Sequence, residues 1–554
     1  MRKMGNQLFA DPYLTARLFL DRVTRSSLFA GAKRPIHKAR LAHNHELASL
    51  MLGERPKPGT HLLIGRGPYN QILGVTPKPG RPELGNIAVI APPRHGKGLH
   101  ATAQLLTWEH SAIVIDIKGE HYERTGGARE KRFGPTFVLS PFGTGCQFDP
   151  LENCKTEDDC LTFANYMLEK TGDEKADAFI LRAQTMLTAA FMAALKEGHP
   201  LLPYLAYLIH IGPEAAGERL EILSRNLALP EDKNLATRFL GRRFADTDFD
   251  DRYLQNSWAN QTALLLPILT ETVIRSVSGS DFTIEDFLFG KTVWENGRLV
   301  RKPITLYLSI PEERLKALSP LIRLVLKTIV NGITLLYDKR KGEGCQPVLL
   351  LADEAGAAPI PGLPELAATV CGRGISIWAC FQDLNQPKSV YGTARAATLL
   401  NSMETQIFTR QSDLSSSEYV GRRLGYKSDY AHATSVHDTQ TTESQSEQAI
   451  LLFTPQEVSE LSETEILCVH RNLKPFRARR TDWREYDDLI ALVKIPAPAL
   501  ATLAEAPQIM PLTPNHQPEP LRVTVTDLRG IRRKHHSTYA HAQDQTQPQK
   551  NRQE

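Results

Sequence analysis

The sequence predicts an α/β protein with a mainly parallel sheet and an inserted all-α domain. Two short runs rich in apolar and β-branched residues, 86–91 (NIAVIA) and 111–117 (SAIVIDI), are typical of buried strands. Between them, residues 98–108 (GLHATAQLLTW) carry apolar side chains at helical spacing. A strand, a helix and a second strand form a βαβ unit, which implies parallel strands joined by a right-handed crossover.

The later part of the chain predicts the insert and the return of the sheet. Residues 156–275 contain four helix-like segments and almost no strand-like alternation. Strand signals return around Asn296-Gly297, a pair typical of a tight hairpin turn. They continue in residues 346–355 (QPVLLLADEA) and 375–382 (ISIWACFQ). In residues 453–461, a capping box predicts a helix start, with Thr454 as the cap, Pro455 in the first position and Glu457 as the third residue.

Charge and composition restrict the class of protein less than the motifs do. A net charge of +4 over 554 residues does not favour nucleic acid as a partner. The first sixty residues and residues 532–536 (RRKHH) are locally basic, which suits DNA, an anionic membrane surface or a solvated face. The seven cysteines are scattered without a Cys-x-x-Cys pair, so we expect reduced thiols and no zinc site.

Hydropathy predicts a protein that is soluble or at most adjacent to a membrane. No stretch reaches the roughly 18 uncharged apolar residues that a transmembrane helix needs. Residues 11–23 (DPYLTARLFLDRV) are interrupted by charges and indicate an amphipathic helix. We expect the part of the chain beyond residue 490, which is rich in Pro, Gln, His and Thr, to be disordered.

Residues 91–98 (APPRHGKG) resemble a phosphate-binding loop, because they follow a predicted strand and precede a predicted helix. Gly96 permits close approach of the backbone, and Lys97 supplies the positive charge. Two positions depart from the general pattern: Ala91 replaces a glycine, and Gly98 replaces the hydroxyl residue that binds Mg²⁺. A water molecule or Thr102 is the alternative magnesium ligand. The residues expected to contact ATP are Ala91, Pro92, Arg94, His95, Gly96, Lys97, Gly98 and Leu99.

A second motif predicts the catalytic and metal-binding groups. The apolar run that precedes Asp353-Glu354 has the form of a Walker B strand. Asp353 would hold Mg²⁺, Glu354 would activate the attacking water, and Lys97 would contact the phosphates. Gln382, at the end of the next predicted strand, would sense the γ-phosphate. A capped helix after Asp353-Glu354 and a solvent-facing Gln382 are the alternatives, but the order of the motifs favours an ATP-hydrolysing site.

The distance along the chain between Lys97 and Asp353 exceeds what a minimal nucleotide-binding domain needs, so we expect an inserted domain between them. The expected segments are a basic N-terminal segment (1–84), the first part of the nucleotide-binding domain (85–155), the inserted all-α domain (156–275), the second part of the nucleotide-binding domain (276–490) and a disordered tail (491–554).

Residues 91–129 resemble the type IV secretion coupling proteins of the TraG type, the motor ATPases of conjugative DNA transfer. That family carries an Ala/Gly-Pro-x-Arg-x-Gly-Lys-Gly loop, then Leu-x-x-Trp, then Asp-x-Lys-Gly-Glu; this chain has 91–98, Leu105, Trp108 and 116–120 in that order. Both departures from the general P-loop are usual in the family. Further matches, spread from about residue 60 to 480, are GSDF (279–282), ADEAG (352–356), CGRGISIWACFQDLNQ (371–386) and LLFTPQEVSEL (451–461).

The resemblance implies a RecA-like motor domain, hexamers, and ATP-driven movement of single-stranded DNA with its bound relaxase into a type IV secretion channel at the inner membrane. In hexameric motors a neighbouring subunit supplies an arginine to the transferring phosphate. Arg373 is the first candidate and Arg410 the second, with an ion pair inside the fold as the alternative for Arg373. Asp116, Lys118 and Glu120 would organise the site, unless they form a plain turn. Trp108 is expected in the core.

Two other functions remain open on the sequence. One is a cytosolic double-stranded DNA translocase of the FtsK/HerA type, against which the 116–120 motif and the long helical insert argue. The other is a nucleotide-gated adaptor without translocation, which has no need of a water-activating Glu354. Many members of the family begin with transmembrane helices, and none is visible here. A separate membrane partner, docking through the basic amphipathic start, and a membrane segment missing from this sequence are the alternatives. The expected location is the cytoplasm, peripheral to the inner face of the membrane.

Overall fold

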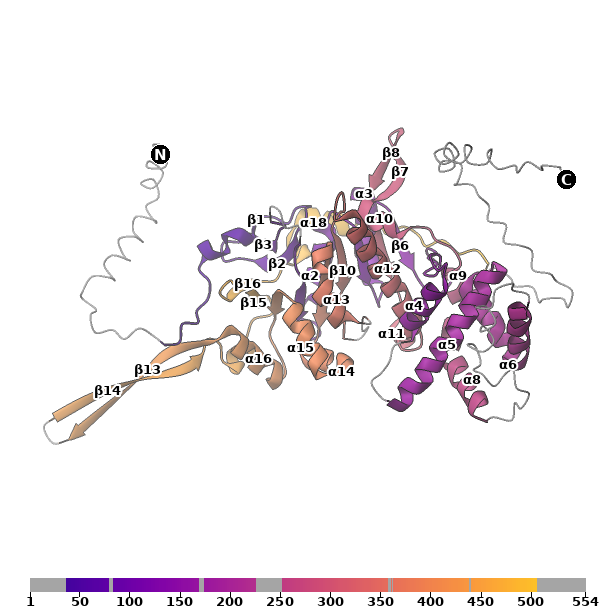
Figure 1. Cartoon of the computed structure of the whole chain (residues 1–554). Coiled ribbons are helices and arrows are strands. Elements are labelled where there is room, and N and C mark those ends of the chain that lie inside the picture. Colours follow the sequence, from indigo (N-terminus) through magenta and orange to yellow (C-terminus); the bar gives the residue numbers. More distant parts are fainter. Residues whose placement is uncertain are drawn as a thin grey trace, which may run out of the picture. The chain divides into compact units, whose positions relative to one another are not determined.

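The computed structural model describes residues 36–78, 83–168, 174–225, 252–356, 360, 362–437 and 440–505 (Figure 1). The chain divides into two compact units. The first unit lies within residues 1–138, 283–312 and 332–499, and the second within residues 139–282, 313–331 and 500–554. The boundaries at 139 and 282 lie outside the segment 156–275 that the sequence predicts for the helical insert.

A twelve-stranded sheet forms the centre of the first unit, in the order β1-β3-β2-β16-β15-β12-β4-β11-β10-β5-β9-β6. From β12 to β9 neighbouring strands are parallel, and from β12 to β1 they are antiparallel. The strands are β1 (Met51–Gly53), β2 (Leu62–Arg66), β3 (Ile72–Val75), β4 (Ile87–Ile90), β5 (Ala112–Ile115), β6 (Thr136–Leu139), β9 (Thr305–Leu308), β10 (Val348–Ala352), β11 (Ile375–Phe381), β12 (Thr405–Phe408), β15 (Glu465–His470) and β16 (Phe476–Arg479).

Two groups of helices accompany this sheet. Helices α2, α3 and α18 pack on one another, and α13, α14 and α15 form a second group. The helices are η2 (Asn44–Leu50), α2 (Lys97–Thr107), α3 (Glu120–Arg132), α10 (Ile284–Phe289), α13 (Leu363–Thr369), η5 (Cys371–Arg373), α14 (Asn385–Tyr391), α15 (Thr393–Ser402), α16 (Leu414–Leu424), α17 (Pro455–Ser459), η6 (Trp483–Glu485) and α18 (Asp487–Val493). Helix α12 (Ser319–Arg340) begins in the second unit and ends in the first.

The central strands are buried along their whole length, which is why their sequences are continuous apolar runs. Every residue of β4, β5, β10 and β11 is buried, as expected for a parallel sheet that is covered on both faces. Trp108 is also fully buried, and its Nε1 donates to the carbonyl of Ser111 at 2.9 Å. The predicted strands at 86–91, 111–117, 346–355 and 375–382 and the core position of Trp108 are therefore confirmed.

Local turn and cap signals are also confirmed. Asn296 and Gly297 have φ values of 50° and 77° and connect the hairpin strands β7 (Lys291–Glu295) and β8 (Arg298–Lys302). The Thr454 hydroxyl accepts from the backbone N–H of Glu457 at 3.2 Å, and the Glu457 carboxylate accepts from the N–H of Thr454 at 2.7 Å. A second hairpin, β13 (Tyr426–His437) and β14 (Gln440–Leu451), forms a long two-stranded ribbon (Figure 1).

The second unit is mainly helical. Its helices include α4 (Glu157–Met167), α5 (Glu174–Glu197), α6 (Leu201–Arg225), α8 (Arg252–Leu265), η4 (Leu266–Ile268) and α9 (Glu271–Ser276); α11 (Glu312–Leu315) begins at its boundary. A buried ion pair joins α5 to α6, because Arg219 donates to Glu197 at 2.8 Å while its Nε contacts the Tyr204 hydroxyl at 3.0 Å. Helix α6 is kinked at Gly212, which has a non-helical φ of 84° and is followed by Pro213.

The chain ends differ from the sequence-based expectation where they are described. The segment 1–84 contains η2 and three strands of the large sheet, β1, β2 and β3. Strand β2 pairs with β16, with Arg66 opposite Arg479. The expected start of the tail at residue 491 falls inside α18, and the described chain continues to residue 505. The predicted amphipathic helix at 11–23 and the basic residues 532–536 lie outside the described residues.

Among the described residues, two helices are long and apolar enough to cross a membrane by length and composition alone. They are residues 177–197 of α5 and the whole of α12. Half of the apolar window of each is buried inside the structure. The core helix of a soluble protein passes the same test, so these two helices are weak evidence for a membrane span.

Close packing of the segment after α18 against α3 generates a stability prediction. A Cβ on Gly127 of α3 would lie 2.1 Å from the carbonyl oxygen of Pro496 and 2.7 Å from that of Ile495. Gly127→Ala therefore forces backbone atoms apart, and we expect it to lower the free energy of unfolding by about 1–3 kcal/mol. Gly372→Ala is the matched control, since nothing lies within 4 Å of its Cβ position. Chemical denaturation would measure both, and equal stabilities would contradict the packing argument.

Candidate functional site

Four neighbouring parallel strands, β4, β11, β10 and β5, end at one edge of the sheet in the first unit. Polar residues follow each of them, and together they line a pocket of about 560 Å³. The lining residues are Pro93, Arg94, Gly96, Lys97, Gly98, Leu99, Ile115, Asp116, Ile117, Lys118, Glu120, His121, Arg124, Asp353, Glu354 and Gln382. The pocket therefore gathers residues that are far apart in the sequence, as expected at the carboxyl edge of a parallel sheet.

The loop between β4 and α2 has the geometry of an anion-binding site. Ala91 is buried, and its N–H donates to the carbonyl of Phe381 at 2.9 Å. This bond continues the pairing of β4 with β11 by one residue, so the loop begins after Ala91. Arg94 and Gly96 have φ values of 66° and 76°. Gly96 precedes the first residue of α2 and no side chain caps this helix start. The uncapped N–H groups and the side chain of Lys97 suit a phosphate.

The structure separates the eight residues predicted to contact ATP into two sets. Arg94 and the segment 96–99 line the pocket, together with Pro93, which the sequence-based prediction omits. Ala91, Pro92 and His95 do not line it. His95 instead places its ring Nδ1 2.9 Å from the carbonyl of Pro93, within the loop.

Asp353 lies directly against the loop. A Cβ on Gly98 would lie 3.3 Å from Asp353 Oδ2, so the carboxylate occupies the neighbourhood of the missing hydroxyl. The same oxygen is 3.2 Å from Nε2 of the buried His121. Burial raises the pKa of Asp353, but its hydrogen bond to His121 and the charges of His121 and Lys97 outweigh burial and lower it. Asp353 is therefore ionised in the pocket wall.

Magnesium fits this carboxylate. Asp353 Oδ1 is buried and has no hydrogen-bond partner among the described residues, so one oxygen remains to coordinate a cation. Thr102, the alternative ligand, is buried on α2 and does not line the pocket. Among the described residues no group of three or more His, Cys, Asp or Glu side chains forms a metal cage, so a cation here would rely on water and phosphate oxygens as well.

Glu354 is engaged by a lysine from the neighbouring strand end. Lys118 Nζ lies 2.6 Å from Glu354 Oε1. This hydrogen bond raises the pKa of Lys118 and so favours its charged ammonium form beside the carboxylate. Asp116 has a separate task, because its carboxylate accepts from the N–H of Tyr122 at 2.8 Å and stabilises the first turn of α3. Glu120 lines the pocket and pairs with Arg124 at 2.8 Å.

His121 and Arg124 are pocket residues that the sequence-based prediction missed. Both lie in the first two turns of α3, directly after the 116–120 motif. Their separation of three residues places them on one side of the helix. This spacing, directly after a motif at the end of a strand, could have indicated that both residues face the site. Although burial lowers the pKa of His121, its hydrogen bond to Asp353 and the charges of Asp353 and Asp116 raise it.

Gln382 and the candidate arginines occupy different places. Gln382 follows β11 and lines the pocket. Arg373 precedes the same strand, so it lies at the opposite end of β11, where it pairs with Asp338 at 2.8 Å. Arg410 follows β12, is exposed and does not line the pocket. Neither arginine contributes to the pocket of its own chain.

The fold and the site define a class: a RecA-like α/β domain with a P-loop and a helical insert. The chain belongs to the family described as type IV secretory system conjugative DNA transfer proteins, whose model matches residues 72–505. A VirD4 protein of Rhizobium radiobacter is 24% identical over 419 residues, which are 71% of this chain and 56% of the relative. A TraG conjugal transfer protein of Escherichia coli is 26% identical over 390 residues, 63% of this chain and 58% of the relative.

Solved structures show a similar fold. The bacterial conjugative coupling protein TrwBdeltaN70 aligns with a TM-score of 0.56 at 16% identity, covering 86% of this chain and 99% of that chain. TrwB in complex with ADP and Mg²⁺ aligns with a TM-score of 0.53, also at 16% identity, over 82% and 96% of the two chains. The present chain spans little more than half the length of the VirD4 and TraG proteins above.

Proposed function

We propose that this chain is a coupling-protein ATPase, which recruits relaxase–DNA or protein substrates to a type IV secretion channel and drives single-stranded DNA transfer in conjugation. The proposal rests on one observation: a single pocket at the carboxyl edge of the sheet is lined by Lys97, Asp353, Glu354 and Gln382. The family membership and the complex of TrwB with ADP and Mg²⁺ support a nucleotide in this pocket.

Each residue has a role that follows from its chemistry. The N–H groups at the start of α2 and the Lys97 ammonium bind the phosphates of ATP. Asp353 holds the coordination shell of Mg²⁺, which when bound neutralises charge on the phosphate oxygens. Glu354 accepts a proton from the attacking water. Gln382, at the tip of β11, contacts the γ-phosphate.

The ion pair between Lys118 and Glu354 restrains the proposed base. In the structure Glu354 is bonded to Lys118, so its carboxylate oxygen Oε1 is occupied. The carboxylate keeps a second oxygen and further acceptor positions for a water molecule near the γ-phosphate. We therefore assign Lys118 to orienting Glu354.

A ring of subunits completes the proposed site. Arg94 and Arg124 line the pocket of this chain, and a neighbouring subunit would supply a further arginine to the transferring phosphate, as in hexameric motors. Arg373 stays the first candidate and Arg410 the second. Arg373 would have to break its ion pair with Asp338 before it contacts a phosphate. Arg410 is exposed and would only have to extend into the pocket of the neighbouring subunit.

The partners of the proposed motor are single-stranded DNA, relaxase or relaxosome proteins and the channel components, and its place is the cytoplasmic face of the inner membrane. A double-stranded DNA translocase of the FtsK/HerA type is the second candidate for a RecA-like domain, and the family match argues against it. A nucleotide-gated adaptor is the third, and the presence of Glu354 in the pocket argues against it.

Lys97→Ala tests nucleotide binding. Lys97 is only 9% exposed and lines the pocket, so its removal takes away the charge-assisted contact to the phosphates. We expect the affinity for MgATP to fall by roughly a hundredfold or more, which isothermal titration calorimetry would measure. Lys388→Ala, at an exposed position of α14, is the control and should bind normally. Tight ATP binding by Lys97→Ala would exclude this loop as the phosphate site.

Glu354→Gln tests the proposed base. The amide retains the shape of the side chain but cannot accept the proton, so we expect ATP to bind while steady-state hydrolysis falls by roughly 10²–10⁴-fold. Glu123→Gln, on the exposed side of α3 outside the pocket, should hydrolyse ATP like the unmodified chain. If Glu354→Gln retains full turnover, the base is another residue.

A further inference from the structure

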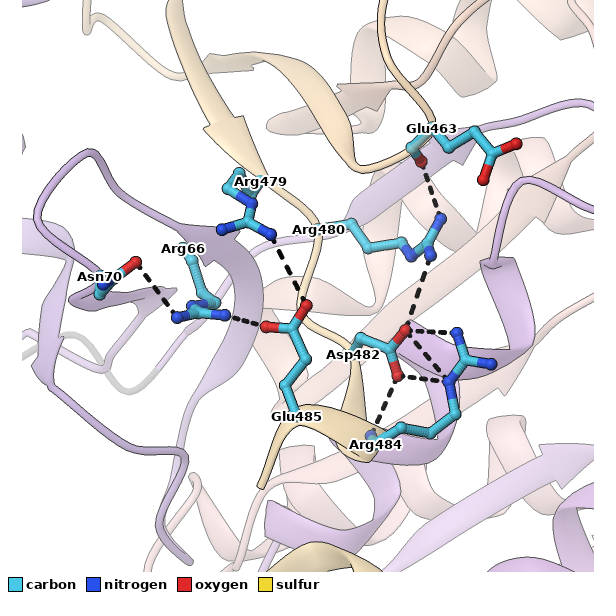
Figure 2. Close-up of polar contacts among 8 residues, drawn as sticks. All are labelled: Arg66, Asn70, Glu463, Arg479, Arg480, Asp482, Arg484 and Glu485. Carbon is cyan, nitrogen blue, oxygen red and sulfur yellow. Dashed lines mark hydrogen bonds and ion pairs between the residues drawn. The ribbon is translucent and has the colours of Figure 1, made fainter. Parts of the chain in front are cut away.

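A buried arginine from the antiparallel part of the sheet reaches the P-loop. Arg480 directly follows β16, and its side chain is only 10% exposed. Its Nη1 donates to the carbonyl of His95 in the loop at 2.9 Å and to the carbonyl of Glu463 at 2.9 Å. Figure 2 shows Arg480 between Glu463 and Asp482. Arg480 does not line the pocket, so it contacts the loop from outside the nucleotide space.

The same guanidinium packs against the next residue of the loop. A Cβ on Gly96 would lie 2.3 Å from Cζ of Arg480 and 2.4 Å from Nη1. Gly96 also has a φ of 76°, which side chains disfavour. The backbone conformation therefore requires glycine at this position, and the missing side chain leaves the space that the Arg480 guanidinium fills.

These contacts determine which way one peptide group of the loop faces. The carbonyl of His95 and the N–H of Gly96 belong to the same peptide plane, and in a trans peptide they point in opposite directions. The His95 carbonyl faces Arg480, so the Gly96 N–H faces away from it. Because Gly96 lines the pocket, this orientation presents the N–H to a phosphate.

The charge around Arg480 is unbalanced. Asp482 is the carboxylate that pairs with it, at 3.6 Å, and the same carboxylate accepts from Arg484 at 2.7 Å (Figure 2). Two guanidinium groups thus share one carboxylate, and Arg480 Nε has no hydrogen-bond partner among the described residues. The surplus positive charge next to the P-loop favours the binding of an anion there.

We propose that Arg480 is a positioning residue for the nucleotide site: it holds the His95–Gly96 peptide with its N–H toward the phosphates and adds positive charge behind the loop. The proposal rests on the proposed function, since it requires that the pocket bind ATP. It also connects the P-loop to the segment 463–482 of the antiparallel strands, so a movement of that segment would reach the phosphate site through one side chain.

The test compares Arg480→Gln with Arg480→Lys and with Arg484→Gln. Arg484 shares Asp482 with Arg480, and its hydrogen bonds within the described part of the chain go to Asp482 and not to the P-loop, so it is the matched control for loss of one arginine from the cluster. Dissociation constants for MgATP and MgADP and the melting temperature would be measured for each variant. Arg480→Gln should weaken nucleotide binding at least tenfold, Arg480→Lys should restore part of the affinity by keeping the charge, and Arg484→Gln should bind within about twofold of the unmodified chain.

One outcome would overturn the proposal, and a second would remove its charge component. In the first, Arg480→Gln and Arg484→Gln lower the melting temperature alike and bind nucleotide alike, which would make Arg480 a structural residue only. In the second, Arg480→Lys, measured in folded protein, binds no better than Arg480→Gln although the unmodified chain binds ATP, which would exclude the contribution of charge. If the unmodified chain does not bind ATP, the proposed function fails instead, so the two failures are distinguishable.

Discussion

The parallel alignment of β5, β10, β11 and β4 is the constraint on which the site depends. Ala352 of β10 pairs with Ile115 of β5 and with Ala379 of β11, and Phe381 of β11 pairs with Ile90 of β4. The residues that follow these strand ends therefore reach the same edge together. A slip of one strand by one residue would exchange the side chains packed on its two covered faces, so the packing of each apolar run against both layers also fixes where the polar residues stand.

The two departures from the general P-loop pattern have structural reasons. Ala91 is buried at the strand end, where its N–H pairs with β11 and its methyl group packs in the core, so a small apolar residue suffices. Gly98 leaves room for Asp353, whose carboxylate oxygen would be 3.3 Å from a Cβ at that position. The loop and the carboxylate are thus fitted to each other, and Arg480 contacts the loop separately, at the carbonyl of His95.

Local patterns predicted much of the fold and of the pocket. Continuous apolar runs predicted β4, β5, β10 and β11, and the residues directly after them supplied Lys97, Asp353, Glu354 and Gln382. Contacts between distant segments could not be predicted in this way. The pairing of β2 with β16 and the hydrogen bond from Arg480 to His95 connect residues about 400 positions apart, and neither leaves a periodic or spaced signal in one sequence.

Steady-state ATP hydrolysis by the purified chain, with and without single-stranded and double-stranded DNA, tests the central claim most directly. Measurements at low and moderate salt are needed because contacts to DNA phosphates weaken steeply with salt. The proposed coupling motor predicts hydrolysis that single-stranded DNA stimulates more than duplex does. Stimulation by duplex alone would favour a double-stranded DNA translocase, and bound ATP without turnover under any condition would contradict the assignment of Glu354 as a working base.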